Sequence, residues 1–126
     1  MSSDRDAEGF LEPEQIDFQH VLSCVFGIQD HESRTYLVLR SNPGSTVSEL
    51  AGALDRDRSN VNRSLTALME KGFVERQRRL LDSGGYIYQY TAIPLPEARQ
   101  LLHEALDEWV VRVHDRIEEF GTEGRP

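Results

Sequence analysis

Polar side chains that could contact nucleic acid recur along one short segment near the middle of the chain. If this segment is helical, Ser59, Asn60, Arg63 and Thr66 share one face, with Asn62 at its edge. The opposite face is apolar and holds Val61, Leu65, Leu68 and Met69. Hydroxyl, amide and guanidinium groups match the donors and acceptors that base edges and phosphates present in a DNA major groove. Periodicity alone also fits an ordinary amphipathic helix with a solvated outer face.

The distribution of charge along the chain favours nucleic-acid recognition over that alternative. Residues 56–79 carry seven basic and three acidic side chains, a net charge of +4, while residues 1–55 carry −7 and residues 80–126 carry −5. The whole chain of 126 residues is at −8. A positive segment concentrated in one place is the electrostatic footprint expected of a phosphate-binding surface. Its basic side chains are Arg56, Arg58, Arg63, Lys71, Arg76, Arg78 and Arg79.

Two short helices joined by a tight turn would hold these side chains in place. Thr46 and Glu49 have the spacing of a capping box, which predicts a first helix that runs to Leu54. After the turn, Asp57 is the predicted N-cap of the second helix, which ends where Gly72 can adopt a left-handed conformation.

Alternating side chains after this helix predict a β-hairpin. Residues 73–81 and 86–93 are the expected strands, and the paired glycines of residues 82–85 permit the positive φ angles of a tight connection. Period two places Arg76 and Arg78 on one face of the first strand and Arg79 on the other. The second strand carries Tyr86, Tyr88 and Tyr90 on one face, which we interpret as packing for the hairpin rather than a platform for stacked bases.

This order of elements closely resembles the winged helix-turn-helix regulators of the MarR and TrmB-like groups, especially short single-domain forms of halophilic archaea. The matching stretch is TVSELAGALDRDRSNVNRSLTALMEKGFVERQRR at residues 46–79, followed by the hairpin. The resemblance covers roughly residues 30–94. It implies that residues 59–71 form the recognition helix, that the hairpin is the wing, and that residues 30–40 form a helix beneath them. Larger TrmB-like proteins add a sugar-binding domain, for which this chain is too short.

We therefore expect a mainly α fold with one small β-hairpin (α+β) that binds double-stranded DNA. Phosphate contacts are expected from Arg56, Arg58, Lys71, Arg78 and Arg79, and base contacts from Ser59, Asn60, Asn62 and Arg63. Thr66 and Arg76 are also expected to lie in the DNA-binding surface. The tip of the wing, at Ser83 and Gly84, is expected to lie along the sugar-phosphate wall or the minor groove.

A long C-terminal helix should join two copies of the chain into a homodimer. Pro94 and Pro96 precede an apolar stripe with a spacing of three and four residues, and a helix over residues 97–120 would be about 36 Å long. The small core cannot cover such a stripe, although the helix could still fold back onto its own domain. Two recognition helices would then meet successive major grooves about 34 Å apart, on a pseudo-palindromic operator. The expected dimer contacts are Leu102, Leu106, Trp109, Val113, Ile117 and Phe120.

Four segments are expected along the chain: a disordered acidic stretch at residues 1–13, a winged helix-turn-helix at 14–94, the dimerisation helix at 95–120 and a tail at 121–126. Within the second segment, amphipathic helices should end near Gly27 and begin with Asp30 as N-cap. The chain has no apolar run of about 18 residues and begins with polar residues, so no membrane contact and a cytoplasmic location are expected.

Composition suggests a high-salt cytoplasm. Of the 14 basic residues 13 are Arg, and the sequence pI is about 4.9. An acidic surface almost without Lys is typical of halophilic proteins, so monovalent cations and other salt ions are expected partners. A GC-rich genome would also favour Arg over Lys.

Catalytic and cofactor chemistry finds no support in the sequence. No nucleophile with a base and no motif of paired carboxylates is present, so an enzyme, a cofactor and catalytic residues are not expected. His103, Glu104 and Asp107 lie within one turn of each other but lack further ligands for a metal. Cys24 is either a small buried hydrophobic residue or a redox sensor that forms a disulfide between subunits.

Two other functions remain open. The chain could be a winged-helix interaction module that docks on a protein partner and does not bind DNA directly. It could also be a ligand- or redox-responsive repressor, with an effector pocket between the N-terminal and C-terminal helices.

Overall fold

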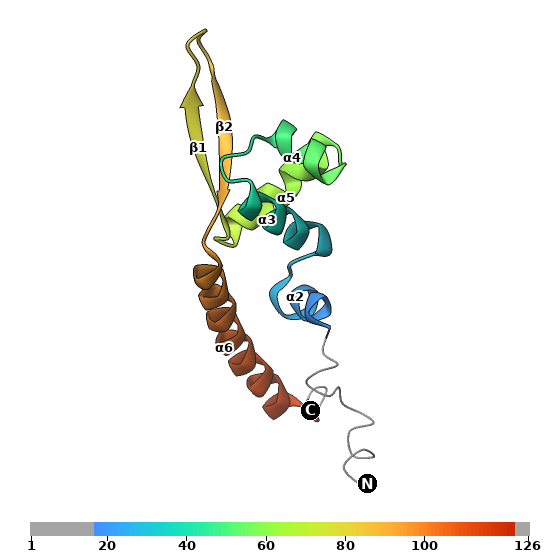
Figure 1. The fold of residues 1–126 in the computed structure, drawn as a ribbon. Helices are drawn as coiled ribbons and strands as arrows, with labels where there is room; N and C mark the ends of the chain where they lie inside the picture. The colour runs from blue at the N-terminus through green and yellow to red at the C-terminus, as the bar shows by residue number, and fades with distance from the viewer. Residues whose placement is uncertain (1–16, 123–126) are drawn as a thin grey trace.

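The computed structural model describes residues 17–122 of the chain, which form five helices and one two-stranded antiparallel hairpin (Figure 1). The order of elements confirms the mainly α winged helix-turn-helix architecture. The predicted disorder of residues 1–13 and residues 123–126 of the predicted tail lie outside the described residues. The elements are α2 (Phe18–Phe26), α3 (Asp30–Ser41), α4 (Val47–Leu54), α5 (Arg58–Glu70), β1 (Val74–Leu80), β2 (Tyr86–Ala92) and α6 (Leu95–Glu119).

The capping interactions of the helix-turn-helix were predictable. At the start of α4, the Glu49 amide donates to the Thr46 hydroxyl at 3.1 Å and the Thr46 amide donates to the Glu49 carboxylate at 2.9 Å, which confirms the capping box. Asp57 caps α5 by accepting from the Asn60 amide at 2.9 Å. Gly72, just beyond α5, has a φ of +88°, as predicted.

Capping residues determine where the two helices nearer the N-terminus begin. The helix α2 begins at Phe18 because Asp17 is extended and its carboxylate accepts from the Gln19 amide at 3.1 Å. The predicted N-cap Asp30 is instead the first residue of α3, since the Glu32 carboxylate reaches back to the amide of Gln29, which takes the cap position.

The core lies where α3, α4 and α5 meet the base of the hairpin. Its most deeply buried side chains include Leu39, Leu50 and Leu65. Tyr36 joins α3 to the hairpin, because its hydroxyl donates to the Ile93 carbonyl at 2.8 Å. Leu37 is 51 % exposed because the buried face of α3 is formed by Glu32, Thr35, Tyr36 and Leu39.

A short extension of the sheet anchors the wing to the helices. The Tyr90 amide donates to the Ser45 carbonyl and the Gly44 amide donates to the Tyr90 carbonyl, each at 2.8 Å. This bridge holds β2 beside the loop between α3 and α4, so the rest of the hairpin projects beyond the helices (Figure 1).

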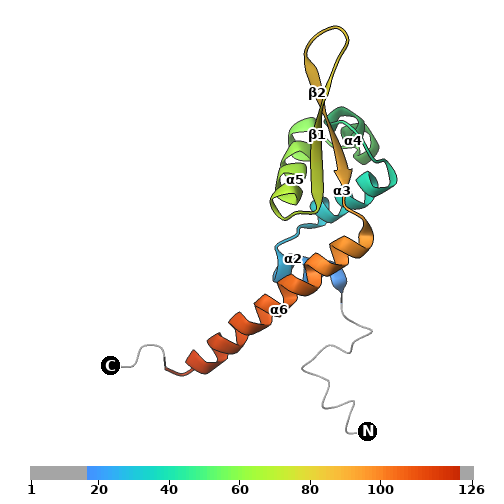
Figure 2. The ribbon, with the colours of Figure 1, turned by 90° about the vertical axis from the view of Figure 1, so that its left-hand side faces the viewer.

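The helix α6 runs away from the winged helix on the side opposite the hairpin tip (Figures 1 and 2). Ala98, near its start, is its buried residue, whereas Ile117 is 59 % and Phe120 85 % exposed. Within the described residues, the outer part of the apolar stripe is thus not covered by the chain's own domain. None of the described helices is long and apolar enough to cross a lipid bilayer.

Candidate nucleic-acid interface

The helix α5 has the two faces that its sequence predicts. Val61, Leu65 and Leu68 are buried against the core, and Met69 is half-buried beside them. The opposite face is open to solvent, with Ser59, Asn62, Arg63 and Thr66 exposed and Asn60 half-buried.

A buried polar contact between α3 and α5 was not anticipated. The Ser64 side chain is fully buried, and its Oγ lies 2.7 Å from Nδ1 of His31. Ser64 lies between the two faces of α5, so its sequence position alone gave no signal of a tertiary partner. This contact helps to fix the rotation of α5 and therefore which side chains point outward.

The N-terminal turn of α5 is held by a small hydrogen-bond network. The Asp57 carboxylate accepts from the Asn60 amide at 2.9 Å and from the Ser59 hydroxyl at 3.2 Å. These two donors stabilise the charged form and hold the pKa of Asp57 below its ordinary value. On the outward face, Nη2 of Arg63 donates to Oδ1 of Asn60 at 2.6 Å. Two predicted base-reading side chains are thus in direct contact.

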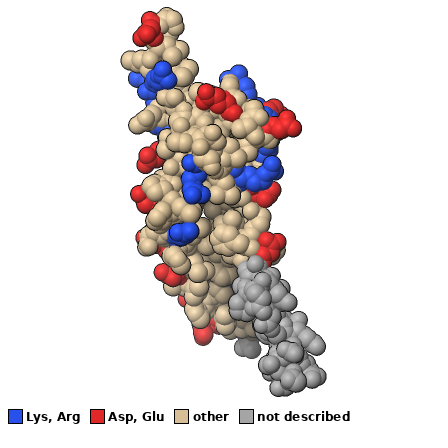
Figure 3. All heavy atoms as spheres, in the orientation of Figure 1, with Lys and Arg blue, Asp and Glu red and all other residues tan. Residues whose placement is uncertain are grey.

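The predicted arginines keep their charge available at the surface. Within residues 17–122, no carboxylate oxygen lies within 4.0 Å of the guanidinium groups of the arginines in the segment 56–79. Figure 3 shows basic groups on the hairpin and beside the helices that Figure 1 labels α4 and α5, with acidic groups along α6. The arginines of the positive segment therefore form no ion pairs with the carboxylates of the described chain.

Lys71 has a different role from the one expected. Its Nζ lies 3.5 Å from the Glu32 carboxylate, and the Glu32 side chain is only 9 % exposed. A buried carboxylate needs such a partner, because leaving it unpaired in a low-dielectric site is costly. Lys71 thus links the end of α5 to α3 instead of standing free for a phosphate.

The wing arginines follow the predicted strand faces. The register pairs Arg76 with Tyr90 and Arg78 with Tyr88, so both arginines share the tyrosine face. The Arg76 guanidinium lies 4.1 Å from the centre of the Tyr88 ring, a cation–π contact. Arg79 pairs with Ile87 and lies on the other face.

The three tyrosines of β2 have different surroundings along the strand. Tyr90 is 2 % exposed and packs in the core, as predicted, whereas Tyr86 is 49 % exposed. Tyr86 and Tyr88 meet edge to face at 5.3 Å, and the Arg78 guanidinium lies 5.0 Å from the Tyr86 ring. The outer tyrosines therefore support arginines, a role that could have been found by pairing the two alternating strands in register.

The tip of the hairpin adopts the backbone that its glycines predict. Gly84 and Gly85 have φ angles of +90° and +82°. Ser83 and Gly84 are both exposed there, so the tip can approach another surface closely.

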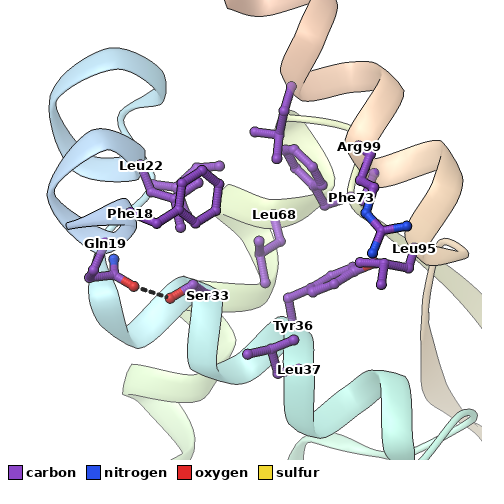
Figure 4. A pocket seen from close by; sticks show the side chains of 13 residues that line it. Phe18, Gln19, Leu22, Ser33, Tyr36, Leu37, Leu68, Phe73, Leu95 and Arg99 are labelled. Carbon is purple, nitrogen blue, oxygen red and sulfur yellow. Dashed lines mark hydrogen bonds between the residues drawn. The ribbon is translucent and has the colours of Figure 1, made fainter. Parts of the chain in front are cut away.

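A cavity lies between α2, α3 and α6 (Figure 4). Its volume is about 330 Å³ and its wall is largely apolar, with Tyr36, Leu68 and Phe73 among the lining residues. Arg99 also lines it. Gln19 accepts from the Ser33 hydroxyl at 2.9 Å, and its buried amide nitrogen has no partner among the described residues. The cavity lies on the opposite side of the domain from the hairpin tip.

Cys24 is exposed, so its interpretation as a buried hydrophobic residue is wrong. Its sulfur lies 3.4 Å from Nε2 of His20, one turn earlier on α2. In the described part of the chain, no three His, Cys, Asp or Glu side chains are grouped to hold a metal ion.

Comparison with known proteins identifies the family and supports the fold. A sequence model of the family described as "Sugar-specific transcriptional regulator TrmB" matches residues 22–95. The uncharacterized protein MJ1503 of Methanocaldococcus jannaschii is 33 % identical over 106 residues, which cover 84 % of this chain and 80 % of the relative. A possible transcriptional regulator from Methanosarcina mazei Go1 has a similar structure, with a TM-score of 0.74, 23 % identity and coverage of 84 % and 90 %. The structure of Streptococcus pneumoniae FabT in complex with DNA also has this fold, with a TM-score of 0.52, 21 % identity and coverage of 86 % and 71 %.

Proposed function

Because the chain belongs to the TrmB family of transcriptional regulators, we propose that it is a sequence-specific DNA-binding regulator that acts as a homodimer. Regulators of this family are not enzymes. One observation carries the proposal: the outward face of α5 presents polar and guanidinium groups beside a wing whose arginines are free of ion pairs with described residues. A similar fold has been solved with DNA in FabT.

The outward face of α5 is the proposed base-reading surface. Its amide, hydroxyl and guanidinium groups can bond to base edges in the major groove. The proposed base contacts are Ser59, Asn60, Asn62, Arg63 and Thr66. Arg56 and Arg58 lie at the N-terminal end of α5, where the half-buried Arg56 and the exposed Arg58 can bond to the phosphates that border the groove.

The hairpin is the proposed phosphate clamp. Arg76 and Arg78 lie on one face and Arg79 on the other, so a wing inserted beside the duplex would meet phosphates on both sides. Ser83 and Gly84, at the exposed tip, complete this surface. Lys71 is not part of the proposed interface, because it is paired with Glu32.

The apolar stripe on α6 is the proposed dimer contact. A 25-residue helix is about 37 Å long, and its outer half is exposed in the described chain. A two-fold pairing of α6 helices would bury this stripe and place two copies of α5 on one side of a duplex, so the operator should be a pseudo-palindrome. The proposed contacts are Leu102, Leu106, Trp109, Val113, Ile117 and Phe120.

A selection from randomised duplex DNA tests the proposed function. The wild-type chain should enrich a pseudo-palindromic site and bind it more tightly than a scrambled duplex of the same length. Enrichment of no sequence, together with equal binding to selected and scrambled duplexes, would instead support the alternative of a winged-helix module that docks on another protein.

Response to a small ligand is a second candidate function, and the cavity between α2, α3 and α6 favours it. Its volume of about 330 Å³ falls in the range of small-molecule sites, and its wall combines apolar side chains with a buried amide donor. Filling the cavity by Ala98→Leu should abolish any ligand-induced change in DNA affinity but leave DNA binding without ligand intact. Retention of the ligand response in this variant would place the effector elsewhere.

A further inference from the structure

The contact between Asn60 and Arg63 bears on which base the recognition helix reads. We infer that these two side chains act together as a donor-only pair that reads guanine, so that Asn60 does not make the adenine contact usual for an asparagine. This inference rests on the proposed function, because it assigns a base to the DNA surface proposed above.

The two residues lie one turn apart on the outward face of α5, where side chains three residues apart are neighbours. Nη2 of Arg63 donates to Oδ1 of Asn60 at 2.6 Å. A hydrogen bond from a charged guanidinium is stronger than a bond between two neutral groups. One of the two lone pairs of the Asn60 amide oxygen is therefore taken by a cation on the same protein surface.

The backbone of Asn60 is fixed as well. Its amide N–H donates to the Asp57 carboxylate at 2.9 Å, and the residue is half-buried at the first turn of α5. The Ser59 hydroxyl donates to the same carboxylate at 3.2 Å. Asn60 thus enters an interface with its position set by Asp57 and its amide orientation set by Arg63.

A carboxamide offers one oxygen with two acceptor lone pairs and an NH₂ group with two donors. Arg63 takes one lone pair and places its guanidinium beside the other, so the groups best placed to face a base are the NH₂ of Asn60 and the remaining N–H groups of the guanidinium. All of these are donors. The pair therefore matches a base edge that presents only acceptors.

Guanine presents two acceptors, N7 and O6, in the major groove, whereas adenine presents the acceptor N7 and the donor N6 amino group. An asparagine that reads adenine must accept from N6 with its oxygen. Here that approach would bring the adenine amino group against the Arg63 guanidinium, donor against donor. Guanine avoids this repulsion and can receive bonds from both side chains.

The first test is a selection from randomised duplex DNA with the wild-type chain and with Arg63→Ala, Asn60→Ala and Asn60→Asp. The wild-type half-site should contain a guanine whose enrichment disappears in Arg63→Ala. Asn60→Asp keeps an oxygen for Arg63 but loses the NH₂ donors, so it should weaken binding to the guanine site without creating a preference for adenine. Asn60→Ala should also weaken it.

The second test replaces the selected guanine by 7-deazaguanine, which lacks the N7 acceptor. Wild-type affinity should fall about 5-fold or more, while Arg63→Ala, which keeps only the Asn60 donors, should lose less on the same replacement. Inosine keeps N7 and O6 and should bind like guanine. Arg112→Ala, which removes an exposed arginine of α6, serves as the matched control and should show the wild-type preference. Circular dichroism would verify that each variant is folded.

The outcomes separate this inference from the proposed function. If the wild-type chain enriches no DNA sequence, the proposed function fails and the inference fails with it. If it enriches a site in which adenine is required and Asn60→Ala removes that requirement, only the inference fails. The same holds if guanine enrichment persists unchanged in Arg63→Ala or if Asn60→Asp binds like the wild type.

Discussion

The Lys71 ammonium lies 3.5 Å from the Glu32 carboxylate, an ion pair that joins the C-terminal end of α5 to α3. It pairs the one lysine of the chain, whose side chain is 30 % exposed, with a carboxylate of its own domain. The arginines of the same segment have no such partner among the described residues. The positive segment thus divides into one structural cation and a set of arginines that face outward.

Lys71→Ala should therefore lower stability and leave DNA recognition intact. The substitution strands the buried Glu32 carboxylate, which should cost about 1–3 kcal/mol in the free energy of unfolding. Urea unfolding of the wild type and the variant measures this cost, and Lys71→Ala with Glu32→Gln should recover part of it. If the folded Lys71→Ala variant lost as much DNA affinity as Arg79→Ala, Lys71 would have to contribute directly to DNA binding.

Tyr88→Leu should weaken DNA binding through Arg76. The centre of the Tyr88 ring lies 4.1 Å from the Arg76 guanidinium, which stacks over the face of the ring. The N–H donors at the edge of the guanidinium stay free for phosphate. An exposed cation–π contact contributes about 0.5–1 kcal/mol, so affinity should fall about 2- to 5-fold on every sequence.

Tyr88→Phe retains the ring and is the matched control for this prediction. It should bind like the wild type. In an Arg76→Gln background, Tyr88→Leu should have no further effect on fluorescence anisotropy titrations. An equal loss with and without Arg76 would show that Tyr88 acts on the fold of the wing rather than on this arginine.

Ile117→Glu should disrupt the proposed dimer. Ile117 lies on the stripe of α6 and is 59 % exposed in the single chain, and a buried carboxylate at a two-fold interface would face its own copy. Val111 is also 59 % exposed but lies on the opposite side of the helix, so Val111→Glu is the control. Sedimentation velocity should show a dimer for the wild type and the control and a monomer for Ile117→Glu. If the wild type, Val111→Glu and Ile117→Glu were all monomers, or all dimers, this interface would be ruled out.

Salt should affect DNA binding less than is usual for a regulator. Binding normally releases counterions and weakens as salt rises. The chain carries −8, so we propose that cations are taken up between its acidic surface and the DNA, which offsets this release. Titration of the selected duplex across molar KCl should show a shallow or reversed dependence. A steep ordinary loss of affinity would refute cation uptake.

Much of the fold was predictable because it depends on local signals. The capping box at Thr46, the N-cap at Asp57 and the glycines after α5 and at the wing tip each act over a few residues. The alternation in β1 was also enough to place Arg79 on the face opposite Arg76 and Arg78.

Tertiary partners were harder to predict. Glu32 and Lys71 are 39 positions apart in the sequence, and His31 and Ser64 are 33 apart. No local pattern marks either pair. Cys24 was judged by its apolar neighbours, yet its side of α2 is open to solvent. Helix starts shifted because Gln29 and Asp17 took cap positions that neighbouring residues could also have filled.

The most direct test of the account compares Arg63→Ala with Arg79→Ala on the selected duplex and on its scrambled form. Arg63→Ala should cost about 1–3 kcal/mol on the selected duplex and little on the scrambled one, whereas Arg79→Ala should weaken both alike. Equal losses on the two duplexes for Arg63→Ala, or no loss on either, would contradict the claim that the outward face of α5 reads the DNA sequence.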